Sequence, residues 1–411
     1  MSLCPSDKVN KVLTFLSTDI ETIRKAKGGY MEDFTSADNL ISGFKRVKKT
    51  SGWKDAVQRY EINLLREIRK SQKDLRGGTY EQGEGAVFTQ CEQGHLRLVK
   101  ALTVKDMTAQ HSLCDSVLIP SVTPKLIHDN GASLEGKGIS FTRKRFEQHL
   151  CWHYRRYGRE GYILKIDFRK YFDNIRHDVL KEKLKQIIDD PLVLSTVDKI
   201  LKANEIDISF TNDKDYIDRV FNALEYQEID AKLKTGERFM AKSMGIGSPL
   251  SQIAGIFLPL EIDTYCKTMI GLHCYDAYMD DRVIIHRSKD YLWRLLSEIK
   301  AIAKSLGVFI HEDKTQIIKL SHGFTFLKTK YIITKTGRII RKIPRDVVTI
   351  QRRKMKKLAQ FVVDGELSYR AFCSQYEGWR GDKKRYDAYN TLDGMDKLYR
   401  RLKGWIRKSL H

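Results

Sequence analysis

The chain has 411 residues, of which 41% are hydrophobic, enough for about two or three globular domains, and this excludes a disordered protein. Its net charge of +22 favours a polyanionic partner such as nucleic acid. Seven scattered cysteines without Cys-x-x-Cys spacing argue against a zinc site and a secreted disulfide scaffold. Because there is no signal-peptide pattern and no apolar stretch of the ~20 residues that a membrane helix needs, we expect a cytoplasmic protein without a membrane partner.

Residues 1–90 are predicted to form a charged helical extension. Four apolar residues recur on one helical face, and Gly77-Gly78 then ends the pattern. The four are Val57, Tyr60, Leu64 and Ile68. No catalytic constellation is visible here, so we expect this stretch to pack on the core and add basic surface.

The next segment predicts a strand at residues 96–101 and a helix that begins near Lys105. A glycine-rich run at residues 131–138 follows, and it lacks the spacing of a phosphate-binding P-loop. This run fits a flexible loop before a helix that carries Arg143 and Arg145.

An acidic residue ends what reads as a buried strand at residues 161–166. This residue is Asp167, and the turn after it carries two aromatic residues, Tyr171 and Phe172. An acid at the end of a core strand requires a compensating partner, because burial disfavours the charged form of a carboxyl group.

Further along, a glycine-containing run precedes a long helix. A helical stretch is predicted at residues 177–203, and a charged, poorly periodic segment at 204–235 separates it from Met244–Gln252. Glycines in such a run allow the backbone to approach a ligand closely.

Two adjacent acids, Asp280 and Asp281, are predicted at the tip of a β-hairpin. Residues 272–275 and 283–286 read as short flanking strands, with Tyr278-Met279 leading into the turn. The two carboxylates repel each other, and a divalent cation such as Mg²⁺ would compensate them. Together with Asp167 they would form a three-carboxylate site for two metal ions, an arrangement suited to in-line phosphoryl transfer. The alternative is an ordinary surface turn.

Beyond the hairpin, an amphipathic helix at residues 291–306 ends at Gly307. Residues 310–315 form a short charged segment that contains Lys314. Residues 338–357 then carry nine Lys or Arg and one acid. Such a run is either a solvated face or a surface that binds nucleic acid.

The order of these motifs resembles that of the reverse transcriptases. The first palm motif of that family is an aspartate, three residues and two aromatics, and the third is Tyr-x-Asp-Asp, as at Tyr278–Asp281. The chain is identified on this basis as a suspected member of the prokaryotic reverse transcriptases, in the defence-associated, abortive-infection and diversity-generating-retroelement-like group. The ordered motifs cover roughly residues 91–335.

The resemblance implies an α+β fold of the right-hand polymerase type, with an antiparallel palm sheet and helical N-terminal and thumb regions. It also implies three parts along the chain. These are a helical N-terminal extension at 1–90, fingers and palm at 91–335, and a helical basic thumb at 336–411.

The resemblance further implies the residues of an active site. The catalytic residues would be Asp167, Asp280, Asp281 and Lys314, the last donating a proton to the leaving pyrophosphate. Two Mg²⁺ ions, for which Mn²⁺ can substitute, would be bound by Asp167, Phe168, Asp280 and Asp281. Nucleotide-binding residues would be Arg97, Phe172, Ile246, Gly247 and Gln252, and nucleic-acid-binding residues Arg352, Arg353, Lys354 and Lys357.

Several positions depart from the common family pattern. His95 stands where a lysine is usual, and Met107 where an arginine is frequent. Ile246 replaces the commoner glutamine of the second palm motif, a variant similar to that of diversity-generating retroelements. An isoleucine offers only apolar contact and a stiff β-branched shape, so we expect a more error-prone enzyme. The alternative is that Ile246 only packs beneath the fingers.

The function implied is RNA-directed DNA polymerisation in prokaryotic antiphage defence. Alternatives are a mutagenic enzyme of a diversity-generating or retron-type element, an RNA-templated RNA polymerase, which Phe172 disfavours, and a maturase-like RNA-binding protein. Expected partners are an RNA template, a DNA product and deoxynucleoside triphosphates. A dedicated non-coding RNA and a homo-oligomer are left open.

Overall fold

The computed structural model describes residues 33–92, 95–207 and 239–410. Contacts divide the chain into two compact units. Unit 1 comprises the described residues of Met1–Thr142, Lys165–Val283 and Asp290–Thr315, and unit 2 comprises Arg143–Leu164, Ile284–Lys289 and the described residues of Gln316–His411. The start of the predicted N-terminal extension and most of the segment predicted to be poorly periodic lie outside the described residues.

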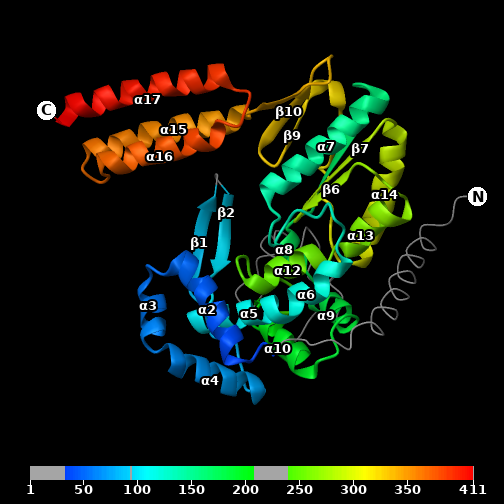
Figure 1. The fold of residues 1–411 in the computed structure, drawn as a ribbon, viewed down its shortest axis with the longest axis vertical. Coiled ribbons are helices and arrows are strands. Elements are labelled where there is room, and N and C mark those ends of the chain that lie inside the picture. Colours follow the sequence, from blue (N-terminus) through cyan, green and yellow to red (C-terminus); the bar gives the residue numbers. More distant parts are fainter. Residues whose placement is uncertain (1–32, 93–94, 208–238, 411) are drawn as a thin grey trace, which may run out of the picture. The chain divides into compact units, whose positions relative to one another are not determined.

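The N-terminal part of unit 1 is helical, as expected. It contains α2 (Ala37–Ser51), α3 (Asp55–Ile62) and α4 (Leu64–Arg76), drawn in blue in Figure 1. The apolar face predicted as one helix spans two, because the chain breaks its helical geometry at Asn63 between α3 and α4. The rings of Phe44 and Tyr60 stack with centroids 5.2 Å apart in the small core that α2 and α3 share.

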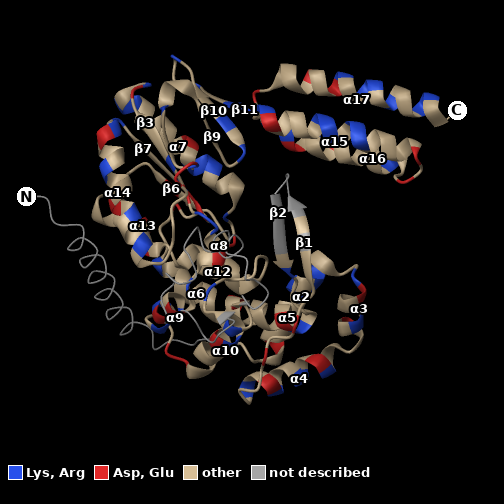
Figure 2. Cartoon of the chain, turned by 180° about the vertical axis from the view of Figure 1, so that it is seen from behind, with Lys and Arg blue, Asp and Glu red and all other residues tan. Residues whose placement is uncertain are grey.

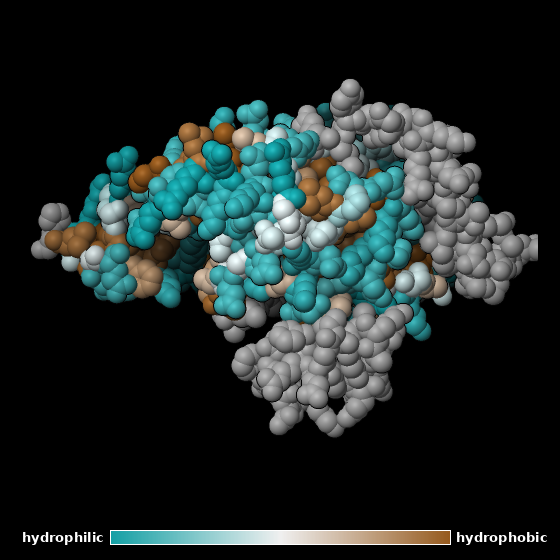
Figure 3. Space-filling view, turned by 90° about the horizontal axis from the view of Figure 1, so that it is seen from below, coloured by the Kyte–Doolittle hydropathy of each residue, from teal (hydrophilic) through white to brown (hydrophobic). Residues whose placement is uncertain are grey.

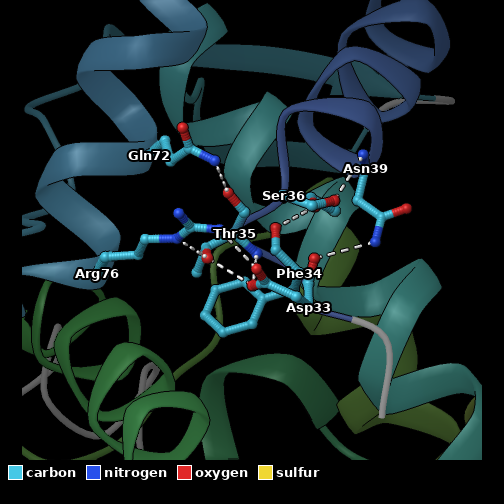
Figure 4. A network of polar contacts seen from close by, with 8 residues as sticks. Asp33, Phe34, Thr35, Ser36, Asn39, Gln72 and Arg76 are labelled. Carbon is cyan, nitrogen blue, oxygen red and sulfur yellow. Dashed lines mark hydrogen bonds and ion pairs between the residues drawn. The ribbon is translucent and has the colours of Figure 1, made fainter. Parts of the chain in front are cut away.

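A network of polar contacts fixes the entry to α2 (Figure 4). Arg76 of α4 donates from Nη2 to Asp33 at 2.7 Å and from Nε to the Thr35 hydroxyl at 2.9 Å. Gln72 of α4 donates to the Thr35 carbonyl at 2.9 Å. The Ser36 hydroxyl accepts the Asn39 N–H and so caps the helix. The loop before α2 is therefore tied to α4 before the helix begins.

The chain continues into an antiparallel hairpin, β1 (Val87–Glu92) and β2 (His95–Lys100), and then into α5 (Val104–Leu113). A short π-helix, Cys114–Leu118, and α6 (Ile119–Val122) follow. Helix α2 approaches α5 closely at Gly43, where an added Cβ would lie 2.5 Å from the Thr108 carbonyl oxygen. Only glycine fits at this contact.

The central sheet has four strands in the order β6-β7-β3-β8. The strands are β3 (Tyr162–Asp167), β6 (Tyr275–Tyr278), β7 (Asp281–His286) and β8 (Gln316–Lys319). The helices of this part of the chain are α7 (Ile139–Tyr157), α8 (Tyr171–Asn174), α9 (His177–Lys185), α10 (Pro191–Lys202), α12 (Pro249–Phe257), α13 (Leu260–Thr264) and α14 (Lys289–Ser305). Two short strands, β4 (Ile206–Asp207) and β5 (Phe239–Met240), pair antiparallel.

Unit 2 contains a three-stranded antiparallel sheet in the order β11-β10-β9. Its strands are β9 (Phe324–Phe326), β10 (Thr329–Ile333) and β11 (Ile339–Lys342). The buried ring of Phe146 on α7 packs against the rings of Phe324, Phe326 and Tyr331, with centroids 5.0 to 5.4 Å apart. Aromatic contacts between α7 and the sheet thus form the core of this part of unit 2.

The last part of unit 2 is a layer of three helices. They are α15 (Arg345–Val363), α16 (Tyr369–Lys383) and α17 (Tyr389–Leu410). Tyr376 of α16 stacks on Tyr399 of α17 at 4.2 Å, and Met355 of α15 lies buried in the same cluster. The three-part division at residues 90 and 335 stays a prediction.

No helix in the described residues is both long and apolar enough to cross a membrane. Figure 3 shows hydrophilic residues over most of the described surface on the face drawn there, with hydrophobic residues scattered among them.

Candidate active site

The two adjacent acids lie at the turn between β6 and β7. Strand β6 ends at Tyr278 and β7 begins at Asp281, so the hairpin predicted from the sequence is present. The preceding strand begins three residues later than predicted, because Leu272 donates its N–H to the Cys266 carbonyl at 2.9 Å and so closes the preceding helix. Met279 in the turn has a φ of +52°, a conformation that costs about 1 kcal/mol for a residue other than glycine.

A buried arginine holds this strained turn. Arg282 donates from Nη1 to the Met279 carbonyl, and its Nε lies 3.2 Å from Oδ1 of Asp263 on α13. The side chains of Arg282 and Asp263 are each only 2% exposed. Asp263 also accepts the Tyr275 hydroxyl at 2.5 Å, and the guanidinium lies 4.7 Å from the ring centre of Phe168. The arginine therefore links the turn to α13, to β6 and to the residue after Asp167.

Asp167 ends β3, beside the segment that contains Lys314. The Asp167 carbonyl accepts the His311 N–H at 2.8 Å, and Phe168 forms an antiparallel bridge with Ile310. The Lys314 ammonium lies 3.9 Å from Oδ1 of Asp167. The fold thus brings the predicted lysine beside the predicted first acid.

The charge of Asp167 acts on both acids of the hairpin. Burial, and then the charge of Asp167, raises the pKa of Asp280 above its ordinary value, although backbone and cationic contacts oppose this. Burial raises the pKa of Asp281 to about 6, where the charges of Asp280 and Asp167 add to it and Lys165 opposes it. Without a further cation, this cluster is costly to ionise fully.

The donor set fits a hard divalent cation. Three carboxylates offer the oxygen ligands that Mg²⁺ and Mn²⁺ prefer. Oδ1 of Asp281 is buried with no hydrogen-bond partner among the described residues, and the Lys165 ammonium stands 3.5 Å from it. A buried carboxylate oxygen in this state has free capacity to coordinate a metal ion.

Phe172 lies close to the acidic turn. A Cβ added to Gly255 of α12 would stand 3.2 Å from the Phe172 ring and 3.6 Å from Sδ of Met279, so both side chains reach the same point on α12. The Phe172 ring is half-buried. Phe172 also accepts the Met244 N–H at 3.0 Å through its carbonyl, which connects it to the glycine-containing run.

His177 anchors the start of the run that contains Ile246, Gly247 and Gln252. Its Nε2 donates to the Ser243 carbonyl at 2.7 Å, and its backbone N–H donates to the Ala241 carbonyl. Burial lowers the pKa of His177 to about 4, so the ring is neutral at pH 7. Ile246 is half-buried, whereas Gly247 and Gln252 are exposed at the start of α12.

The remaining predicted residues lie elsewhere. Arg97 is in β2 opposite Gln90, and its side chain is outside the described residues. The four basic residues predicted to bind nucleic acid are exposed on α15 in unit 2, where Figure 2 shows Lys and Arg recurring along the helix. Among them, Lys354 donates to Gln375 at 3.1 Å and Lys357 lies over the Phe361 ring.

The family model described as reverse transcriptase (RNA-dependent DNA polymerase) matches residues 93–331. The chain belongs to the reverse transcriptase family. Membership confirms the predicted α+β polymerase fold and the predicted class of enzyme, an RNA-directed DNA polymerase. No curated protein matches the chain.

Two solved structures are similar to this reverse transcriptase. One is telomerase from Candida albicans in complex with a TWJ fragment of telomeric RNA, with 12% identity and a TM-score of 0.44 over 79% of this chain and 56% of that one. The other is apo telomerase from Candida tropicalis truncated from the C-terminal domain, with 13% identity and a TM-score of 0.43 over 66% of this chain and 59% of that one. The reverse transcriptase thus spans less than two thirds of either.

Sequence reasoning missed Arg282 and its partner in this reverse transcriptase. A charged residue directly before the apolar run Val283-Ile284-Ile285 was the available signal, because buried arginine requires a paired acid. The identity of that acid, Asp263, could not follow from local spacing.

We predict that Arg282 sets the geometry of the turn as well as stability. Arg282→Met alone should destabilise the protein by about 3–5 kcal/mol, because it leaves Asp263 buried without its partner. Arg282→Met/Asp263→Leu should regain much of that stability and yet lose about tenfold to a hundredfold in kcat, with a smaller change in KM for deoxynucleotide. Thermal unfolding and steady-state primer extension measure the two effects.

A second buried ion pair of unit 1 provides the matched control. Lys183 and Glu261 are 7% and 9% exposed. Lys183→Met/Glu261→Leu should keep wild-type kcat. A wild-type kcat in the Arg282→Met/Asp263→Leu protein would contradict the positioning role.

A pH dependence follows from His177. A histidine with a lowered folded-state pKa stabilises the fold above its unfolded pKa of 6.5, and this contribution is lost as the pH falls toward about 4. The wild type should lose about 3 kcal/mol more than His177→Gln over this range, because other buried histidines such as His111 titrate in both proteins. Urea unfolding between pH 4 and 8 measures the difference between the two proteins. His322→Gln, at an exposed position, is the control, and equal pH profiles of wild type and His177→Gln would refute the prediction.

Proposed function

We propose that the chain extends a primer 3′ end with deoxynucleotides on an RNA template, using Asp167, Asp280 and Asp281 as its catalytic acids. The observation that carries the proposal is geometric: β3, which ends in Asp167, lies beside β7, which begins at Asp281, and Lys165 of β3 is 3.5 Å from Asp281. A protein that only bound nucleic acid would gain nothing from three acids beside it, which argues against the maturase-like alternative.

Two Mg²⁺ ions, or Mn²⁺ in their place, would be held by Asp167, Phe168, Asp280 and Asp281. When bound, they would supply activation of the primer hydroxyl and stabilisation of charge on the transferred phosphoryl group. The protein contributes the fixed positions of its carboxylates, which Arg282 maintains on the hairpin side.

The other residues take roles in the same reaction. Lys314, whose ammonium is 3.9 Å from Asp167, would donate a proton to the leaving pyrophosphate. Arg97 would bind the triphosphate, and Phe172 would lie beneath the sugar and exclude a 2′-hydroxyl. Ile246, Gly247 and Gln252 would line the nucleotide and the templating base.

We assign the template–primer duplex to the basic face of α15. Arg352, Arg353, Lys354 and Lys357 are exposed there and would neutralise backbone phosphates. Unit 2 would thereby include the thumb at residues 336–411, following fingers and palm at 91–335 and the N-terminal extension at 1–90.

The biological setting that we favour is antiphage defence in the cytoplasm of a prokaryote, with a dedicated non-coding RNA as a candidate template. The second candidate is a mutagenic reverse transcriptase of a diversity-generating or retron-type element. Half-buried Ile246 favours it, because an apolar side chain cannot replace the hydrogen bonds of the commoner glutamine.

The first functional prediction concerns the acids. Asp280→Ala and Asp167→Ala should each abolish Mg²⁺-dependent primer extension, because each removes a metal ligand. Neither should lower the melting temperature in EDTA, since each relieves repulsion between carboxylates. Asp189→Ala, in the other Asp-Asp pair of the chain, is the control and should stay active. Near-normal extension by Asp280→Ala would contradict the assignment of these acids as catalytic residues.

The second functional prediction concerns Phe172. Phe172→Val should admit ribonucleotides, because the smaller side chain leaves space beside the sugar. Competition between ribonucleotides and deoxynucleotides in primer extension measures the selectivity. Phe361→Val on α15 is the matched control and should keep the wild-type ratio. An unchanged ratio in active Phe172→Val would remove the proposed role.

A further inference from the structure

Unit 2 contains an open cavity of about 970 Å³, and none of the residues proposed above for the polymerase reaction lines it. It lies where the three-stranded sheet meets the three-helix layer, and its lining comes from β9, β10 and β11, from the first turns of α15 and α17, and from the end of α16. Its volume falls within the range of about 300–1,000 Å³ typical of small-ligand sites.

Positive charge exceeds negative charge among the unpaired side chains of this cavity. Lys330, Lys342, Arg345 and Lys384 line it, and within the described part of the chain none of their side chains forms an ion pair or hydrogen bond. Of the acids in the lining, only Asp346 faces them unpaired, because Asp387 is bonded to Arg338 and to the Arg341 N–H. These four exposed cations outnumber the one unpaired acid, so the cavity carries a positive charge that favours an anion.

The helices that line the cavity add to the positive potential inside it. The first turns of two long helices, α15 and α17, line the cavity, and helix N-termini carry partial positive charge. Three further cations outside the lining act on Tyr386, which lines the cavity. Burial would raise the pKa of its phenol, but the Thr329 hydrogen bond and the charges of Arg143, Lys383 and Arg385 hold that pKa below its ordinary value.

An aromatic ring stands at this cavity. Tyr389, the first residue of α17, lines it and is 82% exposed, which is unusual for so large a side chain. Asn390 and Thr391 add hydrogen-bonding groups beside the ring, and Ile332 and Ile343 supply apolar surface. An exposed ring of this kind is a platform on which a base can stack.

We propose that this cavity binds the phosphates of a nucleotide, between the four cations, with the base against Tyr389. The nucleotide has two possible sources with the same chemistry, a free nucleoside triphosphate or the 5′-phosphorylated end of a nucleic-acid strand. The site lies wholly within unit 2 and requires none of the catalytic acids of unit 1.

Binding of fluorescent ATP to the full chain in EDTA tests the proposal, since metal-dependent binding at the acids is then suppressed. Lys330→Glu/Lys384→Glu should weaken the affinity by about tenfold or more, because each lost charge-assisted contact contributes on this scale. Lys335→Glu/Lys408→Glu makes the same charge change at exposed positions of unit 2 outside the cavity, and should bind as wild type does. Tyr389→Ala should weaken ATP but leave inorganic tripolyphosphate unaffected.

Two further comparisons complete the experiment. A 5′-phosphorylated trinucleotide that binds more tightly than both ATP and its 5′-hydroxyl counterpart identifies a strand end as the ligand, whereas ATP binding at least as tightly identifies the free nucleotide. Asp280→Ala should bind ATP as wild type does in EDTA, which separates this site from the polymerase proposal. Equal weakening by the cavity variant and its control, or no ATP binding by the wild type, overturns the inference.

Discussion

The buried contact between Arg282 and Asp263 is the constraint on which the candidate active site depends. A hairpin turn that carries two carboxylates and a residue at positive φ is strained, and its own residues do not stabilise this conformation. The Arg282 guanidinium stabilises the turn, because it donates to the Met279 carbonyl while Asp263 on α13 neutralises its charge. It also lies over Phe168, next to Asp167, so both strands that present acids contact one rigid cation.

The sequence predicted those parts of the site whose signal is local. The hairpin with Asp280 and Asp281 and the strand ending in Asp167 followed from short apolar runs and turn residues. The beginning of β6 did not, because Leu272 bonds back to the preceding helix. The pairing of Arg282 with Asp263 could not be predicted from the sequence either, since it depends on how α13 packs against the hairpin.

The two basic regions of unit 2 differ in the same way, because one has a local signal in the sequence and the other depends on tertiary structure. The charge run on α15 is visible in the sequence because its members are neighbours along one helix. The cations of the cavity come from β10, β11, α15 and the end of α16, and no pattern in the sequence brings Lys330 beside Lys384. Clusters assembled from distant segments require the tertiary structure, even when each member is an ordinary surface lysine.

The order of segments along the chain has a consequence for biosynthesis. The first segment of unit 2 includes most of α7, whose Phe146 packs against Phe324 and Phe326, and about half of unit 1 is encoded between them. At typical elongation rates, the ribosome needs about ten to forty seconds to reach those strands. Throughout that interval, the Phe146 side of the nascent α7 lacks its aromatic partners, and such exposed apolar surface favours aggregation.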